Sequence, residues 1–371
     1  MNSDQRRVVF QIVLFLLTLI STTLAGAEWT NARSIFMKDF TWSDFFGGFE
    51  YSVPFLLILT VHEFGHYLTA RYHKVAVTLP YYIPLPHFIF PLGTLGAIIR
   101  FRSRVHSKKQ IFDIGIAGPI AGFVMSLVVL FYGFTHLPEP EYIFQIHPEY
   151  KPYGLNYADH VYDKLPAGAD ISIGKNLVFL FFETFVAEPG RVPNAHEIIH
   201  YPYIFAGMLS LMFTCINLFP IGQLDGGHVV YGLFGYRIHR IIATVAFFLL
   251  LLYAGIGVID LSMTSNVLML WIGGSLVFLY LSLFGLGLPK KDTLMYALLI
   301  LVFMLIVGWM FPTAQGYYGW LVFIFILGRF IGIQHPPSEI EEPLDDKRIV
   351  LGWIALFIFV ICFSPAPIEI Q

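Results

Sequence analysis

Apolar stretches about as long as a membrane-crossing helix recur along this chain, and they constrain its fold more than any other feature. An α-helix needs about 20 apolar residues to cross the hydrocarbon core of a bilayer. The segments that meet or approach this length are Val8–Ala25, Ser52–Ala70, Ile111–Phe134, Ile204–Pro220, Ile238–Val258, Val267–Leu286, Thr293–Phe311, Trp320–Ile333 and Ile349–Phe363. We therefore expect an all-α polytopic membrane protein with about nine transmembrane helices.

The composition supports the same class of protein. Of the 371 residues, 57% are hydrophobic and 13% are charged, whereas an ordinary soluble domain is about 25% charged. So few polar residues cannot cover the surface of a soluble globule. These figures also exclude a disordered chain, a coiled coil and a disulfide scaffold, and the net charge of -3 gives no electrostatic reason to bind nucleic acid. The expected surroundings are a lipid bilayer.

The distribution of Lys and Arg predicts the orientation in the membrane. The segment Arg71–Gln110 holds seven basic residues and no acidic one, and Thr135–Gly174 holds six acidic residues and two lysines. Because basic loops stay in the cytoplasm, the first segment should lie inside and the second outside. Only seven residues precede the first apolar stretch, too few for an organelle transit peptide, so we expect a bacterial cell (inner) membrane.

Two segments depart from the helical pattern. Val75–Arg104 is interrupted by prolines and by Gly93 and Gly96, so it cannot form a regular helix. Its Ile, Phe and Tyr residues predict short strands or a loop that dips into the membrane. Leu177–Val186 is apolar but short and carries Glu183, which predicts an interfacial or re-entrant piece rather than a membrane span.

The sequence His62-Glu63-Phe64-Gly65-His66 lies near the end of the second apolar stretch. Residues four apart project from one face of a helix, so His62 and His66 can bind one metal ion together. Glu63, beside the first histidine, is placed to act as a general base. A carboxylate at the centre of a span costs about 2.5–3.5 kcal/mol, so three ionisable groups within five residues indicate a functional site. The alternative, two interfacial histidines bonded to neighbouring helices, leaves Glu63 unexplained.

A catalytic zinc site needs a third protein ligand. The best candidate is Asp225, within the sequence Asn217-Leu-Phe-Pro-Ile-Gly-Gln-Leu-Asp-Gly-Gly-His228. Two glycines follow Asp225 and permit a tight turn with close backbone approach. In the predicted topology this segment emerges on the same side of the membrane as His62 and His66. The alternative is that these residues form only the turn that closes a helix.

Together the two motifs resemble those of the site-2 protease family of intramembrane zinc metalloproteases, over about Phe46–Tyr231. The resemblance implies that His62, His66 and Asp225 bind one zinc ion per chain and that Glu63 is the catalytic base. It also implies a three-helix catalytic core, which corresponds here to the stretches Ser52–Ala70, Ile111–Phe134 and Ile204–Pro220.

The resemblance extends to glycine-containing elements between the motifs. The residues Gly93–Ala97 look like an element that lies in a membrane-associated β-hairpin beside the site, and Gly115–Pro119 is similar to a second one. The resemblance implies that Gly93, Gly96 and Asn217 contact the substrate. We expect three regions: an N-terminal helix and outer loop (1–45), the catalytic core (46–231, including an extracytoplasmic segment at 135–203), and C-terminal helices (232–371).

The expected function is hydrolysis of peptide bonds within or near transmembrane segments of protein or peptide substrates. Such a protease serves regulated intramembrane proteolysis or the clearance of signal-peptide remnants. A membrane metal transporter would use the same histidines but would not need Glu63 as a base, and a scaffold homologue would have lost a ligand or the glutamate. The sequence does not indicate an oligomeric state.

The other histidines are expected to play lesser parts. We expect His228 to cap a helix or to support the metal ligands indirectly. The histidines of the basic loop are expected to be solvated: His73, His87 and His106. Five more fall on the outer side, away from the predicted site: His136, His147, His160, His196 and His200.

Overall fold

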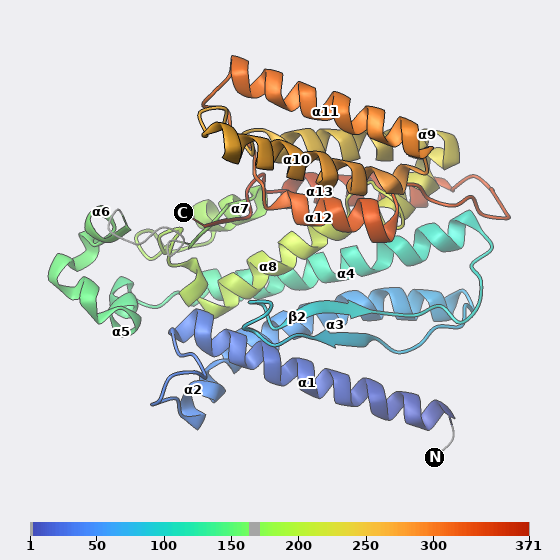
Figure 1. Ribbon diagram of the computed structural model, residues 1–371. Helices are drawn as coiled ribbons and strands as arrows, with labels where there is room; N and C mark the ends of the chain where they lie inside the picture. Colours follow the sequence, from blue (N-terminus) through green and yellow to red (C-terminus); the bar gives the residue numbers. More distant parts are fainter. Residues whose placement is uncertain (1–2, 163–170, 371) are drawn as a thin grey trace. The chain divides into compact units, whose positions relative to one another are not determined.

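The computed structural model describes residues 3–162 and 171–370, which are mostly helical (Figure 1). They divide into two compact units. The first unit comprises Met1–Val105, Asp113–Asn217 and Ile354–Gln371, and the second comprises His106–Phe112 and Leu218–Trp353.

The first unit contains four long helices, several short ones and two small sheets. Its longer helices are α1 (Ser3–Asn31), α3 (Phe49–Tyr72), α4 (Lys108–Thr135, from Asp113 onward) and α8 (Pro202–Asn217). Its shorter helical elements are α2 (Trp42–Gly47), η1 (Pro140–Tyr142), α5 (Ile143–Ile146), η2 (Pro148–Asn156), α6 (Ala158–Val161), α7 (Leu177–Phe185) and η4 (Ile198–His200). Its strands are β1 (Tyr81–Pro84), β2 (Thr94–Ile98), β3 (Ile171–Ile173) and β4 (Ile368–Ile370).

Helix α3 is the centre of this unit and packs against both α1 and α8 (Figure 1). Small residues allow the contact with α1, because a Cβ on Gly48 would lie 2.0 Å from the carbonyl oxygen of Thr23. The hydroxyls of Thr23 and Ser52 are 2.9 Å apart and hydrogen-bonded. Small residues and hydroxyls of this kind hold helices together in a bilayer, where the hydrophobic effect between helices is weak.

Strands β1 and β2 form an antiparallel hairpin that lies along α1. Three side chains of α1 donate hydrogen bonds to carbonyl oxygens of this segment: Gln11 to Leu79 at 2.6 Å, Ser21 to Gly93 at 2.6 Å, and Trp29 to Pro91 at 2.7 Å. The three donors are spread over roughly 27 Å of helix at 1.5 Å per residue, close to the thickness of a hydrocarbon core. The prediction of short strands in Val75–Arg104 is confirmed, and α1 satisfies backbone groups that lipid would leave unpaired.

The position of the hairpin tip contradicts one expectation from the sequence. His87, at the hairpin tip, is 5% exposed, and its Nε2 lies 3.2 Å from Oε2 of Glu28 near the end of α1. It was expected to be solvated on a basic loop. The expectation was wrong because it followed from the basic residues of the loop, whereas the loop packs along α1 from Gln11 to Trp29. His106 is exposed as expected, with 53% of its side chain accessible.

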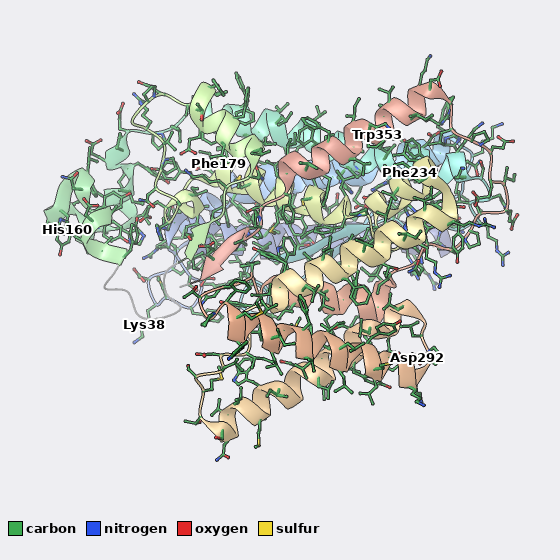
Figure 2. All side chains as sticks on the ribbon, turned by 90° about the horizontal axis from the view of Figure 1, so that it is seen from above. Lys38, His160, Phe179, Phe234, Asp292 and Trp353 are labelled. Carbon is green, nitrogen blue, oxygen red and sulfur yellow. The ribbon has the colours of Figure 1, made fainter. Side chains whose placement is uncertain are left out.

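The second unit is built on α9 (Asp225–Gly255), α10 (Ser265–Ser282), α11 (Lys290–Met310) and α12 (Trp320–Ile326). The turns η5 (Leu283–Leu286) and η6 (Leu327–Ile331) and the start of α13 (Asp346–Cys362) complete it. Helix α9 packs against α12, and α10 against α11. Phe234 and Trp353 meet edge to face with centroids 5.8 Å apart (Figure 2).

Six helices in the described part of the chain are long and apolar enough to cross a membrane. They are Asp4–Asn31, Trp42–Tyr72, Lys108–Thr135, Asp225–Gly255, Ser265–Leu286 and Lys290–Met310. An integral membrane protein is therefore supported, but nine spans and the three-helix core are not confirmed. The remaining expected spans form shorter helices, of 16 residues in α8, 7 in α12 and 17 in α13. Helix α7 has nine residues, which agrees with the prediction that its segment does not span.

Candidate metal centre

His62, Glu63 and His66 lie on α3, in the interior of the first unit. Their exposed fractions are 6%, 6% and 8%. The Nε2 atoms of the two histidines are 3.1 Å apart, and the rings meet edge to face. The four-residue spacing thus brings both imidazoles to one point on one helix face, as the sequence predicts.

Helix α4 fixes the orientation of the second ring. The Nδ1 atom of His66 lies 2.7 Å from the carbonyl oxygen of Ile114. A carbonyl oxygen can only accept a hydrogen bond, so Nδ1 carries the proton and Nε2 presents a lone pair toward His62. A backbone carbonyl that holds one ring nitrogen while the other binds metal is the usual arrangement for a metal-binding histidine.

Glycines allow α4 to approach this closely. A Cβ on Gly118 would lie 2.1 Å from Nε2 of His66, and one on Gly122 would lie 3.1 Å from Cβ of His62. A glycine of α3 contributes to the same contact, because a Cβ on Gly65 would lie 2.6 Å from the carbonyl oxygen of Ala117 on α4. Gly65, Gly118 and Gly122 therefore have a packing role, since they let α4 lie against the histidine pair.

These residues fit a zinc ion. Two imidazole nitrogens converge on one point, where two lone pairs would repel each other without a cation or a proton between them. A buried carboxylate on the same helix turn adds negative charge, and a nitrogen-rich donor set suits zinc. The site is buried, so a bound cation would interact strongly with Glu63.

Asn217, the last residue of α8, reaches this centre. Its Nδ2 atom lies 3.4 Å from Nε2 of His62. Tyr82 of β1 lies beside α3 as well, with its hydroxyl 2.7 Å from that of Thr60, three residues before Glu63. Sequence reasoning did not single out Tyr82, although its place in the Pro-rich segment next to the site was a usable signal.

The two hairpin glycines differ in their surroundings. Gly93 has φ +76°, and a Cβ there would lie 2.5 Å from the carbonyl oxygen of Ser21, so it is required for the contact with α1. Gly96 has φ +103° and has no atom within 4 Å of its Cβ position. Gly93 therefore has a packing role, and a contact of either glycine with substrate stays a prediction.

Asp225 is the first residue of α9, in the second unit. The glycines after it are tightly packed: a Cβ on Gly226 would lie 2.0 Å from the carbonyl oxygen of Leu218, and one on Gly227 would lie 2.2 Å from that of Gly222. The expected turn is present. Metal binding by Asp225 stays a prediction. His228 does not stand alone, because its Nδ1 lies 2.8 Å from Nε2 of His335.

The apolar helices and the buried histidine pair with its adjacent glutamate define a membrane-embedded protein with a metalloprotease-type centre. The model of Peptidase family M50 matches residues 50–253, more than half of the chain, and this region includes every residue of the candidate centre. The chain therefore belongs to Peptidase family M50.

Curated proteins that resemble this chain are named as probable zinc metalloproteases or metallopeptidases. The chain is 32% identical over 180 residues to "Probable zinc metalloprotease EGY1, chloroplastic" of Oryza sativa subsp. japonica, covering 48% of this chain and 27% of that protein. It is 30% identical to the Arabidopsis thaliana protein of the same name, covering 48% of this chain and 28% of that protein. It is 30% identical to "Probable zinc metallopeptidase EGY3, chloroplastic" of Arabidopsis thaliana, covering 57% of this chain and 33% of that protein.

The matched region spans about a third or less of these relatives' own lengths. The relatives are chloroplastic plant proteins, so they do not support the expected bacterial inner membrane. No solved structure matches the chain.

Proposed function

We propose that this protein is an intramembrane zinc metalloprotease that hydrolyses peptide bonds within or near transmembrane segments of other proteins. The observation that carries the proposal is the buried pair of histidines on α3, with Nε2 atoms 3.1 Å apart and Glu63 beside them. Membership of Peptidase family M50 supports it. Glu63 favours a hydrolase over a transporter, because metal passage needs no general base.

The zinc ion would be held by His62 and His66, with Asp225 as the third ligand. Asp225 suits this part because a buried site with two neutral imidazoles needs a carboxylate to offset the charge of a divalent cation. The packing of Gly226 and Gly227 against backbone carbonyls restricts where the first turn of α9 places its carboxylate. When bound, zinc supplies Lewis-acid chemistry, which acidifies a water molecule and polarises a carbonyl group.

Glu63 would act as the general base and then as the general acid. Its carboxylate accepts a proton from the attacking water and returns it to the nitrogen of the departing amine. Glu63 is 6% exposed, and a largely dry site strengthens its electrostatic effect on the reacting groups.

The substrate must be presented as an extended segment, because the carbonyls of an intact helix are already hydrogen-bonded. We propose that β2 offers its edge to the unwound segment by strand addition. Leu95 and Ile98 of this strand are 52% and 51% exposed, so they are accessible to a partner. Gly96 leaves space beside the strand, and Asn217, whose Nδ2 lies 3.4 Å from Nε2 of His62, would hydrogen-bond the substrate backbone.

The predicted orientation puts this site toward the side of the membrane that carries Arg71–Gln110, the cytoplasmic side if the protein lies in a cell membrane. The catalytic core would be residues 46–231. Substrates would be membrane proteins or peptides, in regulated proteolysis or in clearance of signal-peptide remnants. Affinity capture with an inactive variant would identify them.

The test is the substitution Glu63→Gln in the full chain, purified and reconstituted into vesicles. A protease loses cleavage by at least about a hundredfold and keeps its bound zinc, because the general base is removed and the ligands are not. Glu50→Gln, in the first turn of the same helix, is the matched control and should cleave normally. Cleavage retained by Glu63→Gln, or zinc flux into the vesicles that the substitution does not change, would contradict the proposal.

A further inference from the structure

A second group of metal-binding side chains lies in the first unit, apart from the HEFGH centre. Ligand atoms of His147, Glu197 and His200 lie within 4.8 Å of one another. The side chains of Glu197 and His200 are 3% and 6% exposed, and that of His147 is 23% exposed. Sequence reasoning set these histidines aside, although the Glu-x-x-His spacing of residues 197–200 was a signal for a shared ligand point.

Both rings are oriented as in a metal site. The Nδ1 atom of His147 lies 2.8 Å from Oε1 of Glu149, and the Nδ1 atom of His200 lies 3.2 Å from the carbonyl oxygen of Thr30. Both oxygens accept, so both Nδ1 atoms donate, and both rings direct an Nε2 lone pair inward. The two Nε2 atoms are 3.0 Å apart.

This arrangement repeats that of the HEFGH centre. There the Nε2 atoms are 3.1 Å apart, and the carbonyl oxygen of Ile114 holds Nδ1 of His66. In both places two lone pairs face each other, which is unfavourable unless a cation or a proton lies between them. Because the two rings here come from segments more than fifty residues apart, helix geometry alone does not impose the convergence.

Glu197 adds an oriented carboxylate. Its Oε2 lies 3.6 Å from Nε2 of His200, and its Oε1 accepts a hydrogen bond of 2.6 Å from the hydroxyl of Tyr162. A carboxylate held in this way by a phenol can turn its second oxygen to a metal without leaving the first one unpaired. Two imidazoles and one carboxylate form a donor set that suits zinc and disfavours magnesium or calcium.

The two centres are separate. Thr30 lies seven residues beyond Thr23 on α1, and Thr23 contacts Ser52, where α3 begins to run back along α1 (Figure 1). At 1.5 Å per residue, His62 and His66 lie about 25 to 32 Å from Thr30 along the helix axes. No single ion can therefore serve both pairs.

The second group faces a cavity of about 420 Å³. The other walls of this cavity include Glu28, Trp29 and the tip of the hairpin at His87 and Phe88. A fourth coordination position directed into this space would be open to water or to a small ligand, as in zinc sites with three protein ligands. The carboxylate of Glu28, which also lines the cavity, adds negative charge that favours a cation there.

We propose that His147, Glu197 and His200 bind a second zinc ion, which fastens the segment around His147 to η4. The hydrogen bond from His200 to Thr30 then connects this site to the end of α1. A metal joined to three points of the chain stabilises the folded state by its binding free energy. The open position leaves room for a further ligand in the cavity.

Metal analysis of the purified full chain tests the proposal. Wild-type protein dialysed against zinc should retain about two equivalents per chain, and His147→Ala and Glu197→Gln should each retain about one. His160→Ala is the matched control: this histidine is exposed in the same extracytoplasmic segment, on α6 (Figure 2), and should leave both equivalents in place. Retention of two equivalents by both His147→Ala and Glu197→Gln would overturn the proposal.

A stability measurement separates this site from the HEFGH centre. In a His66→Ala background, added zinc chloride should raise Tm by several degrees through the second site alone. The double variant His66→Ala/Glu197→Gln keeps the shape of the carboxylate and should lose most of that shift. An equal shift in both proteins, or none in the first, would overturn the proposal. Neither readout depends on proteolysis.

Discussion

At the scale of single residues, the candidate centre depends on how His66 is held. The spacing of His62 and His66 was enough to predict a shared ligand point, because helix geometry places residues four apart on one face. The sequence could not indicate that the carbonyl of Ile114 would fix the ring, nor that Gly118 would lie against it. Those contacts depend on the packing of α4 on α3, and no local pattern encodes that packing.

The substitution Gly118→Ala tests this account of the ring. Its Cβ would lie 2.1 Å from Nε2 of His66, so either the ring or α4 must move. We expect zinc affinity and cleavage to fall together by about tenfold or more, as is typical when the groups that orient a ligand are disturbed. Zinc titration and cleavage assays on one preparation measure both.

Gly273→Ala is the control for this experiment. Gly273 also lies in a helix, α10, but has no atom within 4 Å of its Cβ position. We expect no loss of zinc there. Normal zinc affinity in Gly118→Ala would show that the ring does not depend on this close packing.

At the scale of elements, the hairpin on α1 is the feature that the sequence predicted only in outline. Prolines in Val75–Arg104 excluded a helix, and the strands followed. The reach of the hairpin along α1 was missed, because it depends on donors from a distant segment, such as Ser21 and Trp29. The same lack of sequence proximity hid the convergence of His147 with His200.

Gly93→Ala should displace this hairpin. The residue has φ +76° and lies against the backbone of α1, so a Cβ meets the carbonyl oxygen of Ser21 at 2.5 Å. Because the hairpin is proposed to present substrate and holds no zinc ligand, we expect cleavage to fall at least about tenfold with zinc content unchanged. Product formation and metal analysis provide the two readouts.

Gly190→Ala separates backbone strain from the contact with α1. Gly190 also has positive φ, +85°, but nothing lies within 4 Å of its Cβ position. Its substitution should leave cleavage near the wild-type rate. If Gly93→Ala lost zinc along with activity, the hairpin would be part of the metal centre and not a surface for substrate.

At the scale of the whole molecule, hydropathy identified the class of protein but overcounted its long helices. Six helices meet the length and composition needed to cross a membrane within the described ranges 3–162 and 171–370. Three further apolar stretches form shorter helices, because α8 ends at Asn217 before a proline and α12 passes into a π-helical turn at Leu327. Apolar composition sets neither of these ends, so a hydropathy count could not have found them.

The proposed third zinc ligand belongs to this scale, because Asp225 follows the hairpin and α4 by ninety residues or more. Asp225→Ala should lower retained zinc and cleavage together by at least about tenfold, since it removes the proposed third ligand. Asp292→Ala is the matched control, an aspartate in the first turn of α11 (Figure 2). Zinc retained at wild-type affinity in Asp225→Ala would require another third ligand.

Identification of the cleavage products tests the central claim most directly. A single-span substrate peptide would be reconstituted into vesicles with the zinc-loaded protein, and the new termini identified by mass spectrometry. Wild-type protein should release fragments that end within the apolar segment, and the Glu63→Gln variant with equal bound zinc should release none. Equal yields of the same fragments from both proteins, or cleavage confined to residues outside the membrane, would contradict it.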